Sequence, residues 1–137
     1  MPYNKKITLF AILLAFVVIV FGAYVRLTDA GLGCPDWPGC YGFFGVPESS
    51  ESLSEVEKIF PGQVVESGKA WREMIHRYIA STLGFLIMVL FGLSLLQRKK
   101  HSEHTSIRLP FYLLMLVAFQ GLLGMWTVTL KVHPVIV

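Results

Sequence analysis

Long apolar runs alternate with shorter polar segments along this chain of 137 residues. Residues 7–25, 78–96 and 109–130 contain no Asp, Glu, Lys or Arg, and each run is close to the ~20 residues that a helix needs to cross ~30 Å of hydrocarbon. Because an open chain satisfies its backbone hydrogen bonds in lipid only as a helix, the pattern predicts three transmembrane helices, over about 7–25, 76–96 and 109–130. We expect an all-α membrane protein with these helices packed as a bundle.

Composition agrees with this class. Hydrophobic residues make up 54% of the chain and charged residues only 15%, and the mean hydropathy is +0.60, which is high for a soluble domain. The first run is longer than the apolar core of a signal peptide and is followed by Tyr24, Val25 and Arg26 rather than by a small-residue cleavage site. The net charge of +3 comes without a Lys/Arg stripe, so no nucleic-acid partner is expected.

The distribution of charge predicts an orientation. Lys5 and Lys6 precede the first span, and four basic residues lie in the link over 97–108, so both regions are predicted to be cytoplasmic. The long connection over about 26–72 is predicted to lie on the outer face. It carries most of the acidic residues: Asp29, Asp36, Glu48, Glu51, Glu55, Glu57 and Glu66.

After Pro134, the apolar residues 135–137 resemble the first turn of another span. Three helices with a polar face on the second would leave polar groups turned toward lipid unless further helices complete the bundle. We therefore expect residues 1–137 to form one transmembrane domain of three spans plus the start of a fourth, truncated at its carboxyl end.

The outer connection contains the two cysteines of the chain, Cys34 and Cys40. An extracytoplasmic loop is an oxidising setting, so a short-range disulfide is the leading interpretation. A reduced structural pair and a thiol-disulfide redox centre are the alternatives. Further along, Ser52 to Glu55 fits a capping box, and an amphipathic helix is predicted from there to Pro61, either packed in the loop or lying on the bilayer or bundle end.

Polar side chains gather where the outer connection enters the second span. Helical spacing places Glu73, His76, Arg77 and Ala80 along one side. Charged and imidazole groups at membrane depth are costly, so they usually face a bundle interior, a cavity or a cofactor. His76 is accordingly a candidate axial haem ligand, because a neutral imidazole offers a nitrogen lone pair to iron. A hydrogen-bonded interfacial histidine is the competing interpretation.

Glu73 has two interpretations as well. It can accept a proton or stabilise developing positive charge on a substrate, or it can form an ion pair with Arg72 or Arg77. The arginines Arg26, Arg72 and Arg77 can bind propionate carboxylates at the outer surface, or they can be snorkelling anchors.

Small and polar residues elsewhere have simpler explanations. Two pairs of small residues predict close helix packing, and they are Ala80 with Gly84 and Gly121 with Gly124. Gln120 is expected to hydrogen-bond between helices. Three further histidines are interpreted as solvated or loop residues: His101, His104 and His133.

Taken together, three motifs closely resemble the bacterial haem A synthase family across nearly the whole chain. They are Tyr24-Val25-Arg26-Leu27-Thr28-Asp29-Ala30-Gly31-Leu32-Gly33-Cys34 continuing through Trp37-Pro38 to Cys40, then Glu73-x-x-His76-Arg77, and Gln120-Gly121-Leu122-Leu123-Gly124. The resemblance implies the amino-terminal half of an eight-helix protein, built from two similar four-helix halves that each present a pair of histidines to a haem.

The resemblance also implies roles for single residues. His76 would bind the iron of haem O or haem A, the substrate and product of the amino-terminal pocket, and Glu73 would be the catalytic carboxylate. Arg77 and Arg26 would be candidate contacts of the macrocycle, and Cys34 and Cys40 the outer-loop pair. The partner histidine would lie beyond Val137 and the haem b ligands in the other half, so this piece alone is not expected to be active.

The implied reaction oxidises a methyl group of haem O to a formyl group in the bacterial inner membrane and supplies haem A to terminal oxidases. The implied partners are haem O, the lipid bilayer, haem O synthase, oxidase assembly factors and a second copy of the chain. Two other functions remain: a b-type cytochrome that only carries electrons, and a membrane thiol oxidoreductase that uses Cys34 and Cys40. The second needs a further cysteine pair or a quinone site to pass electrons on.

Overall fold

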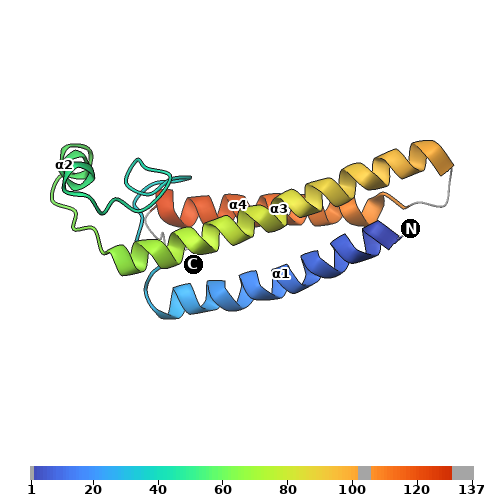
Figure 1. Ribbon diagram of the computed structural model, residues 1–137, viewed down its shortest axis with the longest axis horizontal. Helices are drawn as coiled ribbons and strands as arrows, with labels where there is room; N and C mark the ends of the chain where they lie inside the picture. The colour runs from blue at the N-terminus through green and yellow to red at the C-terminus, as the bar shows by residue number, and fades with distance from the viewer. Residues whose placement is uncertain (1, 102–105, 131–137) are drawn as a thin grey trace. The chain divides into compact units, whose positions relative to one another are not determined.

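The computed structural model describes residues 2–101 and 106–130 (Figure 1). These residues contain four helices: α1 (Pro2–Leu27), α2 (Ser50–Ile59), α3 (Ser67–His101) and α4 (Arg108–Thr129). Three of them are long and apolar enough to cross a membrane, over Lys5–Leu27, Ser67–Lys99 and Arg108–Thr129. The predicted all-α class and the multi-pass membrane character are confirmed. The predicted start of a fourth span, as well as His104 and His133, lies outside the described residues.

Helix α3 is longer than the second apolar run. It begins at Ser67, so residues 67–72 of the predicted outer connection are helical, and it continues to His101 in the predicted link. At its start the carbonyl of Glu66 accepts hydrogen bonds from the N–H groups of Lys69 and Ala70, both at 3.0 Å. Hydropathy alone misses this extension because it contains Lys69, Arg72 and Glu73. The residues Ala70 and Met74 in it pack against the loop.

Helix α1 ends in a hydrogen-bonded cap. The Ala30 N–H donates to the carbonyl of Val25 at 3.0 Å, and Asp29 adopts a left-handed backbone with φ of 49°. This combination is the usual helix ending in which a residue with positive φ follows the last turn, and Asp tolerates that conformation better than most residues. The cap turns the chain into the loop that carries both cysteines.

Helix α2 corrects the predicted capping box. Its cap is Ser49, three residues before Ser52, and the Ser49 side chain accepts the Ser52 N–H at 3.1 Å. Ser49 has the extended backbone that a capping residue needs, with φ of −76° and ψ of 151°. The predicted end before Pro61 is confirmed, since the helix stops at Ile59.

The chain divides into two compact units, and each is described here by itself. Unit 1 comprises Met1–Ile19 and Ile79–Leu122. In unit 1, α3 packs on α4: the rings of Phe91 and Phe111 lie 6.1 Å apart between centroids, and a Cβ added at Gly84 would meet Val117 at 3.6 Å.

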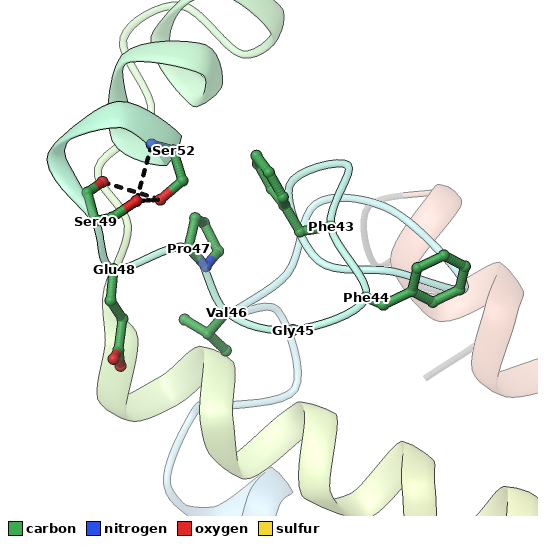
Figure 2. Close-up of a pocket in the computed structure, with 8 residues that line it drawn as sticks. All are labelled: Phe43, Phe44, Gly45, Val46, Pro47, Glu48, Ser49 and Ser52. Carbon is green, nitrogen blue, oxygen red and sulfur yellow. Dashed lines mark hydrogen bonds between the residues drawn. The ribbon is translucent and has the colours of Figure 1, made fainter.

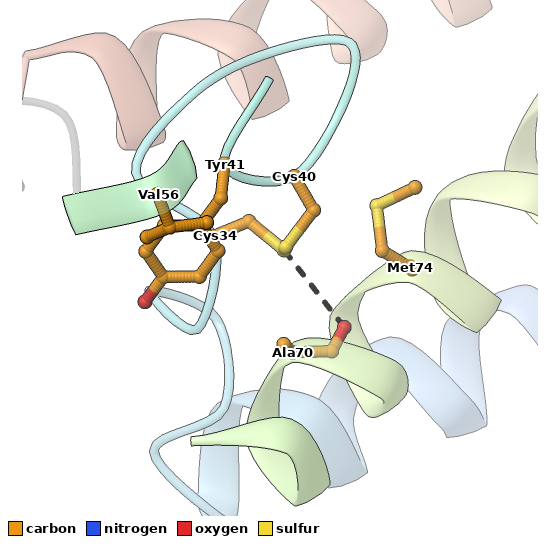
Figure 3. Close-up of a cluster of buried hydrophobic side chains, with 6 residues drawn as sticks. All are labelled: Cys34, Cys40, Tyr41, Val56, Ala70 and Met74. Atoms are coloured by element: carbon orange, nitrogen blue, oxygen red, sulfur yellow. Dashed lines mark hydrogen bonds between the residues drawn. A yellow bond between two sulfur atoms is a disulfide. The ribbon is translucent and has the colours of Figure 1, made fainter. Parts of the chain in front are cut away.

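Unit 2 comprises Val20–Tyr78 and Leu123–Val137, and it contains the loop, α2 and the first turns of α3. Its core is a cluster of six buried residues (Figure 3), which are Cys34, Cys40, Tyr41, Val56, Ala70 and Met74. The two cysteines form a disulfide, as the leading interpretation predicted. Loop, α2 and α3 thus share one small core, so the loop is an integral part of unit 2.

Candidate functional site

The disulfide loop lies directly on the first turns of α3. A Cβ added at Gly33 would come within 2.7 Å of the backbone nitrogen of Ala70, so the two backbones approach as closely as glycine allows. One residue later, the Cys34 N–H donates to Oε2 of Glu73 at 2.9 Å. The Cys34 sulfur contacts the Ala70 carbonyl at 3.9 Å (Figure 3).

A tight turn closes this loop after the second cysteine. Cys40 and Phe43 exchange backbone hydrogen bonds of 2.8 and 3.0 Å, and Tyr41 and Gly42 between them have φ of 54° and 84°. Two central residues with positive φ are typical of a type I′ turn. The Asp36 carboxylate accepts hydrogen bonds from the N–H groups of both central residues. Sequence reasoning missed this role of Asp36, because Tyr41-Gly42 is not one of the residue pairs that usually predict such a turn.

Tyr41 is the second residue that sequence reasoning missed. Its ring is buried in the unit 2 core and packs edge-on against Phe60, with centroids 5.8 Å apart. Burial raises the pKa of the Tyr41 phenol, and the negative charges of Glu66, Asp36 and Glu73 raise this pKa further. The phenol is therefore neutral at neutral pH, and it donates a hydrogen bond to the Val64 carbonyl at 3.5 Å.

Glu73 and Arg77, one turn apart on α3, form a buried ion pair at the surface of α3 that this loop covers. Only 4% of Glu73 is exposed, and its Oε1 contacts Nη2 of Arg77. Nη1 of the same guanidinium donates to the carbonyls of Asp36 at 3.0 Å, Pro38 at 3.3 Å and Gly39. The predicted ion pair of Glu73 is therefore present, with Arg77 as its partner, and both side chains are engaged with the loop.

The other two arginines that were predicted to lie at the outer surface, Arg26 and Arg72, are not part of this pair. The guanidinium of Arg72 lies 5.9 Å from the ring centroid of Tyr24, which is a cation–π distance. Arg26 is exposed in the last turn of α1, where its positive charge also suits the negative end of the helix dipole.

His76 points away from the loop and toward α1. Its ring is half-buried and lies nearly parallel to that of Phe21, with centroids 6.4 Å apart and planes at 23°. A Cβ added at Gly22 would lie 2.7 Å from Nε2 of His76. The structure thus brings Cys34, Glu73 and Arg77 together and places His76 on the neighbouring side of α3, against α1.

The donor set fits a haem better than a bare metal ion. Among the described residues, no group of three His, Cys, Asp or Glu side chains could hold an ion. A haem brings its own equatorial nitrogens and asks the protein only for axial ligands. One half-buried imidazole on a membrane helix is a suitable donor of that kind.

A separate hollow lies at the other side of the loop (Figure 2). Its volume is about 440 Å³, and it is lined by Phe43, Phe44, Gly45, Val46, Pro47, Glu48, Ser49 and Ser52. The Trp71 indole N–H donates to Glu48 at 2.7 Å, and the Tyr78 hydroxyl donates to the Phe44 carbonyl. These two bonds fasten the hollow's rim to α3, and none of its lining residues was predicted as a site residue.

The remaining predicted positions contribute less. Gln120 is exposed, and its interhelical hydrogen bond stays a prediction. A Cβ added at Gly121 or at Gly124 meets nothing within 4 Å. The side chain of His101 is not among those described.

Comparisons with known proteins converge on one group. The family model described as COX15-CtaA, cytochrome oxidase assembly protein, matches residues 5–137. The Heme A synthase of Shewanella oneidensis is 50% identical over 121 residues, which are 88% of this chain and 35% of that protein. The Heme A synthase of Sinorhizobium fredii is 31% identical over 137 residues, covering 90% of this chain and 35% of the relative. The chain therefore spans about a third of the length of these relatives. No solved structure matches.

Proposed function

Because this chain belongs to the COX15-CtaA family of cytochrome oxidase assembly proteins, we propose that it is part of a haem A synthase. Such an enzyme oxidises a methyl group of haem O to the formyl group of haem A. The observation that carries the proposal is the 50% identity with the Heme A synthase of Shewanella oneidensis across 88% of this chain. The buried Glu73 and the half-buried His76 on adjacent turns of a membrane helix give that likeness a chemical site.

The complete enzyme is proposed to be an eight-helix bundle of two four-helix halves, with this chain as most of the amino-terminal half. Three candidate spans and a coverage of 35% of the relatives' length are consistent with that arrangement. On the positive-inside rule, the amino terminus and the α3–α4 link are proposed to lie in the cytoplasm, and the disulfide loop on the outer face of a bacterial inner membrane. Haem O synthase, oxidase assembly factors and a second copy of the chain are the proposed protein partners. A haem b held by the other half is the proposed resident cofactor.

His76 is proposed as an axial ligand of the substrate haem. The iron and the conjugated ring of a bound macrocycle supply the redox chemistry, while the protein supplies position and electrostatics. The side chain of His76 can hold the macrocycle against the end of the bundle. Arg26, exposed one turn beyond Gly22, is the better candidate for a propionate, because the guanidinium of Arg77 is already shared between Glu73 and three loop carbonyls.

Glu73 is proposed as the catalytic carboxylate. One of its oxygens accepts a hydrogen bond from the Cys34 N–H and the other contacts Arg77. The carboxylate is therefore held in one position and does not move freely toward a substrate. A fixed negative charge at low dielectric can stabilise positive charge that develops on a substrate carbon during oxidation. Removing a methyl proton requires the carboxylate to exchange one of these partners for the substrate.

The test is haem analysis in cells that make the complete protein and supply haem O. The wild type should convert extracted haem from the O to the A type, and Glu73→Gln should lower conversion by about 10²-fold or more. Normal conversion by Glu73→Gln would show that Glu73 is not catalytic. Haem O left unchanged by the wild type itself would favour the b-type cytochrome, since an electron carrier does not alter its haem.

The same haem analysis also distinguishes a haem A synthase from a thiol oxidoreductase that uses Cys34 and Cys40. If the cysteines carry the chemistry, Cys34→Ser/Cys40→Ser abolishes every trace of activity, whatever its stability. If they only fasten the loop, conversion per folded molecule survives in part. Folded protein is therefore counted by size-exclusion chromatography in detergent before rates are compared.

A further inference from the structure

The imidazole of His76 occupies a notch in α1 that exists only because residue 22 is glycine. A Cβ added at Gly22 would lie 2.7 Å from Nε2, 3.4 Å from Cε1 and 3.5 Å from Cδ2 of His76. These distances are shorter than, or at the limit of, van der Waals contact. The ring therefore fills the space that any other residue's Cβ would need, and the stacked ring of Phe21 borders it.

The same three distances show which part of the imidazole faces α1. The added Cβ would be almost equally far from the two ring carbons that flank Nε2 and nearest to Nε2 itself. It would thus lie beyond the Nε2 end of the ring, tilted out of the ring plane and away from the axis of that nitrogen's lone pair. Iron bound to an imidazole nitrogen sits about 2 Å away along that axis, as other metals do, and its flat macrocycle spreads sideways across the axis. In this seat, the macrocycle would therefore meet the backbone of α1 beside Gly22.

We propose that the notch at Gly22 is a resting seat for His76 that competes with coordination of the substrate iron through Nε2. The inference rests on the proposed role of His76 as a haem ligand and adds a second position for the same side chain. When the ring is seated against α1, Nε2 cannot reach iron. When the ring turns away from Gly22 about its side-chain torsions, Nε2 can reach iron and bind it.

Competition of this kind lowers affinity in a predictable way. A ligand that binds only one of two states has an apparent dissociation constant equal to the intrinsic constant divided by the fraction of the competent state. A macrocycle that binds as substrate must be released as product. Because the return of His76 to the notch at Gly22 removes the ligand from the iron, it would favour release of the product. Gly22 is then a positioning residue that acts through His76.

The experiment is a titration of the complete, haem-free protein in detergent with ferric haem b, followed by absorption in the Soret region. Binding that depends on His76 is taken as the difference between the wild type and His76→Ala. Gly22→Ala should lower the dissociation constant of this component by about threefold to tenfold, because it closes the seat. Gly92→Ala is the matched control, since a Cβ there meets nothing within 4 Å, and it should leave the constant unchanged.

The outcomes distinguish the proposed role of His76 as a haem ligand from the proposed seat at Gly22. If His76→Ala titrates like the wild type, the proposed ligand is wrong and the seat has no role in haem binding. If His76→Ala removes one binding component but Gly22→Ala leaves its constant unchanged or raises it, only the inference is overturned. A raised constant would mean that the seated ring is the ligating one, bound through Nδ1.

A second measurement covers the case in which Gly22→Ala is poorly folded. In the haem-free protein, Gly22→Ala should lower the midpoint of thermal unfolding by a few degrees, since the added methyl displaces the ring. In the His76→Ala background the same substitution should cost much less, because the three atoms nearest to its Cβ all belong to the ring of His76. An equal loss in both backgrounds would show that the added methyl collides with something other than His76, and this would overturn the inference.

Discussion

The two units of this protein are stabilised in different ways. In unit 1, apolar side chains such as Phe16, Phe85 and Leu109 are 60–67% exposed, which is ordinary for helices whose surroundings are lipid tails. In unit 2, the loop, α2 and the start of α3 enclose a disulfide, a buried ion pair and a buried tyrosine. Membrane-type packing tolerates many substitutions of similar polarity, whereas a small core that includes a disulfide and adjoins a buried ion pair depends on individual atoms. The structure therefore predicts that stability effects in unit 2 will greatly exceed those in unit 1.

Removing the guanidinium of Arg77 should have the largest effect. Arg77→Ala leaves the carboxylate of Glu73, whose side chain is 6% exposed, without its cation, and it takes the donor away from three loop carbonyls. Breaking a buried pair in this way costs about 3–5 kcal/mol. The measurement is denaturant unfolding in detergent. Arg26→Ala is the control, and a loss no larger than that of this exposed arginine would contradict the role of Arg77 in holding the loop.

Breaking the disulfide should come second. Cys34 and Cys40 are six residues apart, so the bridge closes a short loop and restricts the unfolded chain by about 2 kcal/mol. Cys34→Ser/Cys40→Ser should lose about that amount in the same unfolding experiment, and the reductant-treated wild type should match it. A much larger loss would mean that the sulfur atoms matter chiefly through their packing against Ala70 and Met74.

Part of the fold and part of the candidate site could be predicted from the sequence. The three spans follow from apolar runs, because in lipid a long uncharged segment has no stable alternative to a helix. The sequence was sufficient to locate the candidate site on the turn from Glu73 to Arg77. It did not predict the directions in which these side chains point. Periodicity puts Glu73, His76 and Arg77 on one broad side of α3. In the structure, Glu73 and Arg77 contact the loop and His76 contacts α1.

The missed features share a cause. The cap at Ser49, the turn anchored by Asp36 and the extension of α3 to Ser67 all depend on which backbone groups meet which side chains. A run of serines offers several equivalent caps, and only the path of the preceding residues selects one. Such choices depend on the path that the backbone takes in three dimensions, which local sequence signals do not contain.

A smaller effect is expected where the loop backbone touches α3. Gly33→Ala would place a methyl 2.7 Å from the nitrogen of Ala70 and from the carbonyl carbon of Lys69. Backbone atoms cannot move aside as a flexible side chain can, so the loop must lift, at a cost of about 1–3 kcal/mol. Gly31→Ala, two residues earlier and with nothing within 4 Å of its added Cβ, should be nearly neutral. Equal effects at the two glycines would argue against close docking of the loop.

The smallest effect is expected in unit 1, at the contact between α3 and α4. Gly84→Ala adds a methyl 3.6 Å from Cγ1 of Val117, an ordinary van der Waals distance, and alanine is the better helix former by up to about 1 kcal/mol. The variant should therefore unfold within about 0.5 kcal/mol of the wild type or be slightly more stable. Gly84→Leu, which no longer fits between the helices, should be less stable than Gly84→Ala. If Gly84→Ala instead costs as much as Gly33→Ala, the α3–α4 contact is as demanding as the loop core, and the contrast between the two units fails.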